Sequence, residues 1–346
     1  QDIAEFLYLL GVKPVWQKGS LRVTGLEVIP LHELKRPRID VTARISGLFR
    51  DTLPHLAELM DEAVMLVAKL DESDDDNFVR KHIREDSKTL EKSGASADDA
   101  WRNAAFRVFG DAPGTYGSGI NIVLDSKNWE SEKDLADIYV RWGGHAFGGG
   151  RRGVYQPELV KKRLAQIELT VKNEDSHDMN ILSADDYNGF HGGMIAAVKS
   201  FGQKEPVSYV GDSANRGAPK IRTVAEEMKR VVRAESLNPK YIEGLIRHGY
   251  KGAMDMANRL NISFQWDATS NVMEDWMYDD YAQKYAFDPK VQQWMKKVNP
   301  WALQNIAETL LEAQQRQMWN ANNETMEKLQ ELYLSVEGEI EEDDEE

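Results

Sequence analysis

The sequence contains no cysteine. Disulfide bonds, thiolate zinc sites and thiol nucleophiles are therefore all excluded. It also lacks an apolar run of about 18 residues, the length that a membrane-spanning helix requires, and it has no cleavable signal pattern. The sequence thus predicts a protein without a membrane span, and the expected location is the cytoplasm.

The P-loop motif GxxxxGK[ST] is also missing. Since this loop cradles the phosphates of ATP, the chain is not expected to bind and hydrolyse ATP in the usual P-loop manner. The histidine motifs HxH and HExxH do not occur either, which argues against a permanent metal site. The net charge of −15 argues against a nucleic-acid partner, because duplex binding needs a basic face that neutralises phosphates.

The 346 residues are enough for two domains, and their patterns change along the chain. Helical spacing at residues 3–10 is followed by strand patterns at 14–16, 21–28 and 39–45, and helical patterns dominate after residue 271. The predicted fold class is α/β, with a mixed α/β N-terminal part and a largely helical C-terminal part. The expected division is an α/β domain at 1–152, an α/β-to-helical domain at 153–336 and an acidic disordered tail at 337–346. Because the chain starts at Gln1 in the middle of an α/β unit, we expect it to be a fragment with an incomplete first domain.

Residues 238–269 hold more potentially reactive groups than any comparable stretch. The Asn-Pro pair at 238–239 predicts a helix start, because Asn can cap a helix and Pro suits its first position. On helical spacing His248 and Lys251 then fall near one stripe. A single histidine on such a helix is equally typical of a structural residue, so spacing alone names no reaction.

The end of the same stretch predicts a strand at 262–266 that ends in Asp267. Asp267 would then lie at a strand-to-helix junction, a common position for a site carboxylate. Asn271, with Glu274 three residues later, resembles a capping box that starts the next helix.

Three further segments combine glycine or a strand end with polar groups. Arg50 follows the strand at 39–45, and Tyr116 lies in a loop of glycine and proline. Residues 143–153 are glycine-rich and include His145, which predicts a mobile cationic loop able to close over an anionic ligand. Each segment could equally be a plain salt-bridged or connecting element. His191 precedes a predicted helix start near residue 192, where backbone N–H groups are free.

Seven sequence blocks occur in an order that resembles a known family. They are RPRIDVTARISGLFRD, FGDAPGTYGSG, DLADIYVRWGGHAFG, DDYNGFHGGM, NPKYIEGLIRHGYKGA, WDAT and NPWALQNIAETLLEA. The chain resembles the C-terminal part of the cobaltochelatase large subunit (CobN) and, more distantly, the H subunit of magnesium chelatase. FHGGM and WGGHAFG favour the cobalt type, whereas NFVRKH at 77–82 is closer to the magnesium type.

The resemblance implies a tetrapyrrole-binding catalytic subunit that inserts Co²⁺ into a corrin precursor such as hydrogenobyrinic acid a,c-diamide, in cobalamin biosynthesis. It also implies partners: an AAA+ ATPase subunit, which would use MgATP, and its adaptor subunit. Alternatives are an H-type subunit that inserts Mg²⁺ into protoporphyrin IX, and a tetrapyrrole carrier without insertion activity. The runs at 258–261 and 316–319 depart from the usual cobalt-type pattern, which leaves the macrocycle open.

Metal insertion requires a base for the inner N–H protons, ligands that hold and release the ion, and cations for the macrocycle's carboxylates. Histidine and carboxylate suit the first two tasks and arginine or lysine the third. The candidates for base or transient metal ligand are His248, Asp267 and His191. The candidates for substrate binding are Arg50, Tyr116, His145, Arg247 and Lys251. No tightly bound cofactor is expected.

Overall fold

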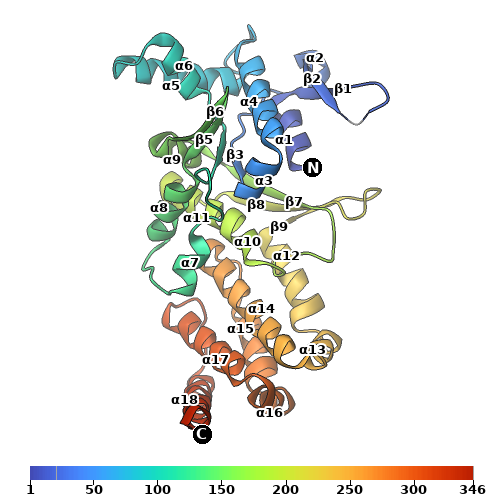
Figure 1. Cartoon of the computed structure of the whole chain (residues 1–346), viewed down its shortest axis with the longest axis vertical. Helices are drawn as coiled ribbons and strands as arrows, with labels where there is room; N and C mark the ends of the chain where they lie inside the picture. The colour runs from blue at the N-terminus through green and yellow to red at the C-terminus, as the bar shows by residue number, and fades with distance from the viewer. Residues whose placement is uncertain (21, 346) are drawn as a thin grey trace. The chain divides into compact units, whose positions relative to one another are not determined.

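The computed structural model describes residues 1–20 and 22–345. Its fold is mixed α/β, with small sheets in the N-terminal half and mainly helices in the C-terminal part, as predicted (Figure 1). The chain forms two compact units whose segments alternate along the sequence. The first unit comprises Gln1–Ile120, Ala136–Ile167 and Ala197–Lys204, and the second comprises Asn121–Leu135, Glu168–Ala196 and Glu205–Glu346. The boundary predicted near residue 153 falls inside a strand of the first unit.

The first unit holds a hairpin and a four-stranded sheet. The strands of the hairpin are β1 (Val12–Trp16) and β2 (Val23–Val28), and those of the sheet, in spatial order, are β3 (Ala43–Ile45), β4 (Val108–Gly110), β5 (His145–Gly148) and β6 (Arg151–Tyr155). Strands β3 and β4 are parallel, and the other neighbours are antiparallel. The strand predicted at 39–45 is confirmed only in its last three residues. Asp40 points instead to Arg107 and His82, at 2.6 and 2.7 Å.

Helices surround this sheet and bury its apolar side chains. They are α1 (Asp2–Leu10), α2 (Leu31–Leu34), α3 (Gly47–Thr52), α4 (Pro54–Ala68), α5 (Phe78–Lys92), α6 (Ala97–Ala104), α8 (Glu132–Gly143) and α9 (Pro157–Gln166). Val64 and Val67 of α4 are fully buried with Val108 of the sheet. Gly11 ends α1 in a left-handed conformation (φ 76°).

The glycine-rich segment at 143–153 is not the mobile loop that the sequence predicts. It forms the antiparallel pair β5 and β6, and the turn between them is Gly149-Gly150, with φ of 61° and 73°. Glycine adopts this left-handed conformation without strain, so the segment can turn tightly. Ala146 and Phe147 of β5 are buried, which fixes the hairpin on the core.

The second unit contains a three-stranded sheet and most of the helices. Its strands, in spatial order, are β7 (Leu169–Glu174), β8 (Val207–Asp212) and β9 (Lys220–Thr223). Strand β7 is parallel to β8, and β9 is antiparallel to it. The helices and π-helical turns are α7 (Ile120–Asp125), α10 (Asp185–Tyr187), η1 (Asn188–Gly192), α12 (Val224–Val231), η2 (Val232–Ser236), α13 (Pro239–Ile246), α14 (Gly249–Ser270), α15 (Asp275–Tyr281), η3 (Ala282–Ala286), α16 (Pro289–Val298), α17 (Pro300–Gln315) and α18 (Asn323–Glu345). Helix α11 (Gly193–Gly202) begins in this unit and continues in the first.

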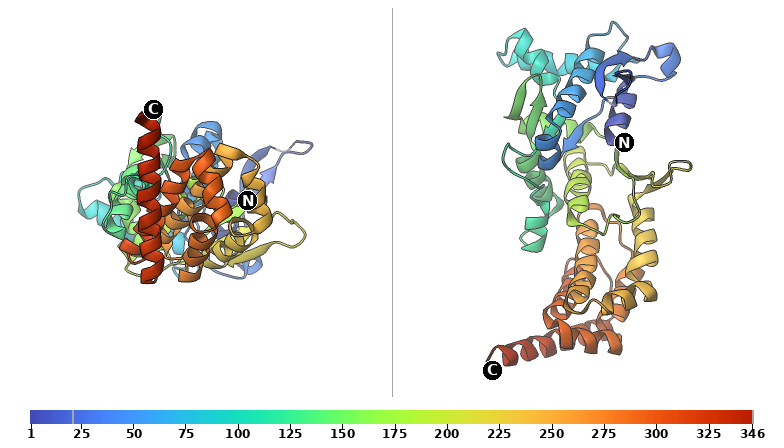
Figure 2. Two further views of the ribbon diagram at one scale, coloured as in Figure 1. Left: turned by 90° about the horizontal axis from the view of Figure 1, so that it is seen from below. Right: turned by 45° about the vertical axis from the view of Figure 1, so that its right-hand side comes forward.

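Helix α14 is central to the C-terminal helices, and α17 packs against both α14 and α18 (Figure 2). The strand predicted at 262–266 is wrong, because these residues lie within α14. Residues 262–270 are all buried, so the apolar periodicity that distinguishes a helix from a strand is lost there. Asp267 therefore lies in the last turn of a helix. Asn271 is the left-handed C-cap (φ 50°) and starts no capping box; Glu274 precedes the next helix.

The acidic end of the chain, expected from the sequence to be a disordered tail from residue 337, lies in α18, which extends to Glu345. Glutamate is a good helix former. Val336 is fully buried and Ile340 packs against the core, which anchors this part of α18. Among the described residues, no helix is long and apolar enough to cross a membrane.

Candidate functional site

His191 is buried in the π-helical turn η1 of the second unit, between β7 and α14. Its Nε2 lies 3.0 Å from the hydroxyl of Thr170 on β7, which in turn donates to Ser208 on β8 at 2.9 Å. The imidazole meets the indole of Trp266 edge to face, with 5.9 Å between ring centroids. π-Helical turns are frequent at functional sites, and this one directs the imidazole inward.

Polar groups line the contact between η1 and α14. Thr269 donates to Asn188 Oδ1 at 2.8 Å, whereas Asn188 Nδ2 is buried without a hydrogen-bond partner. Gln265 has a similarly unpartnered Oε1. Only glycine fits at 192, because a Cβ there would lie 2.1 Å from Asn188 Oδ1. The structure thus gives His191 a tightly packed polar surrounding.

Asp267 is buried at the end of α14, and both of its carboxylate oxygens already accept hydrogen bonds. Oδ1 accepts from the backbone N–H of Met273 at 2.9 Å, and Oδ2 from the hydroxyl of Tyr278 at 3.0 Å. Burial raises the pKa of Asp267 to about 6, despite these hydrogen bonds. The carboxyl can exchange a proton near neutral pH, but its contacts join α14 to α15.

His248 is exposed between α13 and α14, where the helix expected to run through it is interrupted at Gly249 (φ 55°). Asp267 lies 19 residues further along α14, a distance of about 28 Å at the helical rise per residue. These two candidates are therefore not brought together. Arg247 and Lys251 are exposed beside His248, and Lys251 forms an ion pair with Asp255.

Arg50 lies in the first unit and its guanidinium is fully engaged. Nε and Nη2 bind the carboxylate of Asp51, each at 2.7 Å, and Nη1 donates to the backbone carbonyls of Asp111 and Ala112. Arg50 thus holds the loop that carries Tyr116. The Tyr116 hydroxyl donates to Asp51 at 2.8 Å, but the residue is 59% exposed and remains open to a ligand.

His145, the remaining predicted site residue, lies on β5 of the first unit. Its ring packs against Tyr155 of β6, with 4.8 Å between centroids. Its Nδ1 is 3.3 Å from the carbonyl oxygen of Trp142. These contacts place it within the hairpin.

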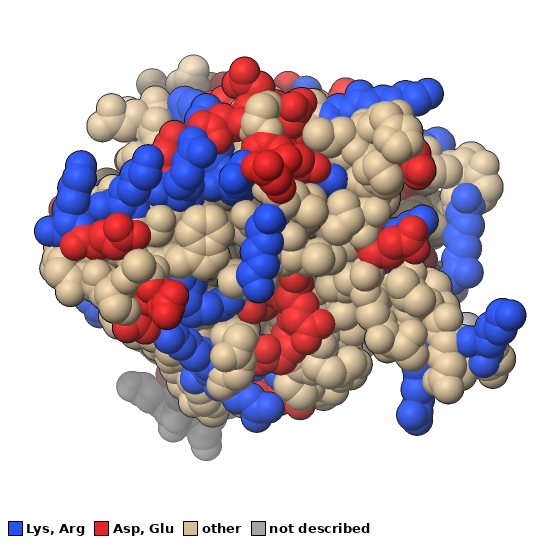
Figure 3. All heavy atoms as spheres, turned by 90° about the horizontal axis from the view of Figure 1, so that it is seen from above, with Lys and Arg blue, Asp and Glu red and all other residues tan. Residues whose placement is uncertain are grey.

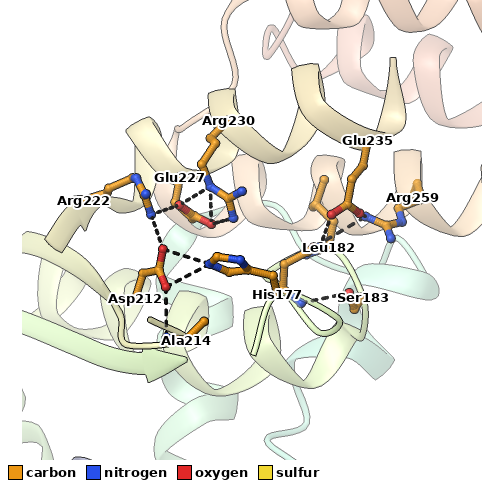
Figure 4. Close-up of polar contacts among 11 residues, drawn as sticks. His177, Leu182, Ser183, Asp212, Ala214, Arg222, Glu227, Arg230, Glu235 and Arg259 are labelled. Carbon is orange, nitrogen blue, oxygen red and sulfur yellow. Dashed lines mark hydrogen bonds and ion pairs between the residues drawn. The ribbon is translucent and has the colours of Figure 1, made fainter. Parts of the chain in front are cut away.

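A charged cluster that the sequence analysis missed lies at the carboxyl ends of β7 and β8. Glu174 and Asp212 are the last residues of these parallel strands and are paired in register. His177, from the loop after β7, places Nε2 at 3.1 Å from Asp212 Oδ1 (Figure 4). Ligands of α/β sheets commonly bind at this end of the strands. In the sequence, the one feature that could have indicated this cluster is an acidic residue at the end of each of the two strands.

Two arginines neutralise most of this cluster (Figure 4). Arg222 donates to both Asp212 and Glu227 at 3.1 Å, and Arg230 Nε donates to Glu227 at 2.9 Å. Burial opposes the ionisation of Asp212, but hydrogen bonds from His177 and Arg222 outweigh it and lower the pKa of this carboxyl. Asp212 is thereby held in its ionised form.

Glu174 has no such compensation. It is 6% exposed, and its buried Oε1 has no hydrogen-bond partner among the described residues. Burial, followed by the nearby Glu227 carboxylate, raises its pKa to about 7. The cluster thus combines ionised carboxylates with one carboxyl that titrates at neutral pH. In the described part of the chain, no three His, Asp or Glu side chains are arranged to hold a metal ion.

Surface charge of both signs is mixed on the face of the first unit drawn in Figure 3, where Lys and Arg alternate with Asp and Glu. Opposite charges at this spacing neutralise one another locally. The visible face therefore differs from the continuous basic surface that duplex nucleic acid requires.

The family model described as CobN/Magnesium Chelatase matches residues 1–326. The chain belongs to the CobN/magnesium chelatase family. An uncharacterised protein of Methanocaldococcus jannaschii is 53% identical over 99% of the chain and 28% of its own length. The aerobic cobaltochelatase subunit CobN of Pseudomonas aeruginosa is 41% identical, over 98% of the chain and 27% of that protein. A chloroplastic magnesium-chelatase subunit ChlH of Oryza sativa is 34% identical, over 99% and 24%.

The family fold is also seen in a solved structure, the catalytic subunit of cobaltochelatase from Mycobacterium tuberculosis. It superposes with a TM-score of 0.93 at 43% identity, over 97% of this chain and 28% of that one. The chain thus spans about a quarter of the length of the family members that it matches.

Proposed function

We propose that this CobN/magnesium chelatase chain is part of the tetrapyrrole-binding large subunit of an ATP-dependent cobaltochelatase. The subunit inserts Co²⁺ into a corrin precursor such as hydrogenobyrinic acid a,c-diamide, in cobalamin biosynthesis. The observation that supports the cobalt reaction is the graded similarity over nearly the whole chain. Identity is 41–43% to cobaltochelatase subunits but 32–34% to magnesium-chelatase H subunits.

The sequence block that resembles the magnesium type has a structural explanation. Asn77, at the start of this block, caps α5 and donates to the carbonyl of Val67 at 3.0 Å. His82, at its end, lies 2.7 Å from the carboxylate of Asp40. Both residues stabilise the first unit, so the block carries little weight in the choice of metal.

The proposed division of roles follows the chemistry of the residues. His191 remains the candidate for base or transient metal ligand, with Asp267 as a second buried proton acceptor. His248, Arg247 and Lys251 form an exposed group suited to the carboxylates of a macrocycle or of a partner. ATP would be hydrolysed by an AAA+ subunit acting with its adaptor, and the metal is a substrate rather than a resident cofactor.

The test is an absorbance titration of the full-length protein with a metal-free corrin precursor and, separately, with protoporphyrin. Cobalt or magnesium is then added with ATP and the partner subunits. We expect corrin binding and cobalt insertion. His191→Gln should retain binding and slow insertion by about 100-fold or more, the usual contribution of one acid–base group. His248→Ala, at the exposed position, is run beside it to test whether His248 takes part.

Two outcomes would favour the alternative functions. Magnesium insertion into protoporphyrin in preference to cobalt would assign the chain to the H-type reaction. Macrocycle binding without insertion of either metal, in the presence of partner subunits active with another large subunit, would identify a carrier.

A further inference from the structure

We propose that Glu174 accepts the proton that leaves an inner nitrogen of the macrocycle as the metal enters. The proposal rests on the proposed function and adds a residue that neither the family motifs nor the sequence pattern marks.

The backbone places Glu174 at a ligand-binding position of the fold. It ends β7 directly opposite Asp212, which ends the parallel strand β8. Its carbonyl oxygen accepts from both the backbone N–H and the hydroxyl of Ser213, at 2.9 and 2.8 Å. The main chain of Glu174 is thus fixed by β8 and Ser213 at the carboxyl edge of the sheet, where open α/β sheets bind their ligands.

The side chain of Glu174 lacks one donor. Every carboxylate oxygen of Asp212 and Glu227 accepts at least one hydrogen bond. Oε1 of Glu174 accepts none within the described residues, although it is buried. A buried carboxylate oxygen without a donor is unfavourable, and a proton or an N–H group of a ligand relieves it. Glu174 is therefore the member of the cluster with unused capacity.

Charges of both signs lie near Glu174. Glu227 on α12 and Asp212 on β8 favour the neutral acid, whereas Lys172 on β7 and Arg230 on α12 favour the carboxylate. Arg222 on β9 and His177 in the loop after β7 bind Asp212. With burial, the result is a pKa of about 7 for Glu174, so it takes up and releases a proton with little driving force either way near neutral pH.

The transfer is balanced without an added reactant. An inner N–H bond of the macrocycle breaks, and its electron pair remains on nitrogen and forms the bond to the metal ion. The proton moves to the ionised carboxylate of Glu174, which becomes a neutral carboxylic acid. Loss of that proton to water restores the carboxylate for the next cycle.

Other buried groups in the second unit are more fully engaged. Both oxygens of Asp267 already accept hydrogen bonds, and the Nε2 of His191 contacts Thr170. Either group would have to give up a hydrogen bond to take the proton. Glu174 would instead receive the proton at Oε1, an atom that accepts no hydrogen bond within the described residues.

The experiment compares the full-length wild type with Glu174→Gln and, as a matched control, with Asp175→Asn. Asp175 is the exposed next residue, so its substitution removes the same charge at almost the same place. Insertion rates are measured by absorbance across pH with metal, ATP and partner subunits, and macrocycle affinity is titrated separately. We expect Glu174→Gln to bind the macrocycle as wild type does, to insert the metal about 100-fold more slowly and to lose the rise in rate around neutral pH. Asp175→Asn should behave as wild type.

An infrared difference spectrum gives a readout that does not depend on activity. The wild type should show a protonated carboxylic acid band that titrates near pH 7, beside that of Asp267 near pH 6, and Glu174→Gln should lack the band near pH 7. Its presence in both proteins, or an unchanged insertion rate and pH profile in the variant, overturns the assignment to Glu174 while the proposed function stands. A wild type that inserts no metal overturns the proposed function instead, and the infrared band still decides whether Glu174 holds a proton.

Discussion

Glu174 and Asp212 end neighbouring parallel strands and lie directly opposite each other, but Asp212 forms an ion pair with Arg222, whereas Oε1 of Glu174 accepts no hydrogen bond within the described residues. The two carboxyls consequently differ in pKa: that of Asp212 lies below its ordinary value and that of Glu174 lies at about 7. Neighbouring carboxyls whose environments separate their pKa values are a common arrangement for acid–base chemistry.

Replacing Glu174 with glutamine should stabilise the protein at alkaline pH. The pKa of Glu174 is about 7 in the folded state against an ordinary 4.5, so the unfolded state loses this proton first and stability falls as pH rises between these values. We expect the free energy of unfolding of Glu174→Gln to exceed that of wild type by about 1–3 kcal/mol at pH 8. Urea unfolding at pH 5 and pH 8 measures it. A gain of equal size at both pH values would contradict the assigned pKa.

Replacing Gly192 with alanine should disrupt the surroundings of His191. The new methyl group would lie 2.1 Å from Asn188 Oδ1 and 2.5 Å from Thr269 Oγ1, so one element must move. We expect a loss of about 1–3 kcal/mol in unfolding free energy. Gly244→Ala is the control, because nothing lies within 4 Å of the added carbon in α13. It should stabilise the helix by about 0.5–1 kcal/mol, and equal losses in both variants would refute the packing argument.

Replacing Arg50 with lysine should loosen the loop that carries Tyr116. Lysine cannot bind Asp51 through two nitrogens and reach the carbonyls of Asp111 and Ala112 together. We expect a loss of about 1–3 kcal/mol on urea unfolding, with faster proteolysis at residues 111–119. Arg152→Lys on the exposed part of β6 should leave both measurements unchanged. Wild-type proteolysis in Arg50→Lys would show that the loop is held by other contacts.

Replacing Asp267 with alanine should leave two buried donors, the Tyr278 hydroxyl and the Met273 N–H, without their acceptor. The expected loss in unfolding free energy is about 1–3 kcal/mol. Asp267→Asn should lose less at neutral pH, because the tyrosine hydroxyl can accept from the new amide. The pKa of Asp267 is raised to about 6, so the wild type loses stability as pH rises from its ordinary 3.8 to that value. The Asn variant should lack this decline, and its persistence there would assign the decline to another group.

Local sequence signals predicted much of the fold. Asn238, Asp288 and Asn299 each precede proline, and each caps the helix that the pair predicts. The capping interaction spans only two or three residues, so tertiary packing has little opportunity to override it.

The wrong or missed predictions concern residues whose secondary structure or protonation depends on contacts with distant parts of the chain. Residues 262–266 form part of α14 because helices from elsewhere in the chain bury every side of it. Glu174 becomes distinctive only when β8 brings Asp212, 38 residues later, to the neighbouring strand, and α12 adds Glu227. No local pattern around Glu174 contains that information. His191, by contrast, was predicted as a candidate from its position before a helix, and the structure buries it in a π-helical turn that was not predicted.

The alternation of the two units along the chain constrains the order of synthesis. The first unit is incomplete until residues 197–204 leave the ribosome, and by then β7 of the second unit has been made while β8 has not. Glu174 is therefore synthesised well before the groups that set its protonation. A single proteolytic cut between residues 121 and 204 leaves at least one unit divided between two peptides, so neither unit can be released intact by such a cut. Full-length expression is thus the appropriate starting point for every measurement of the strand-end cluster.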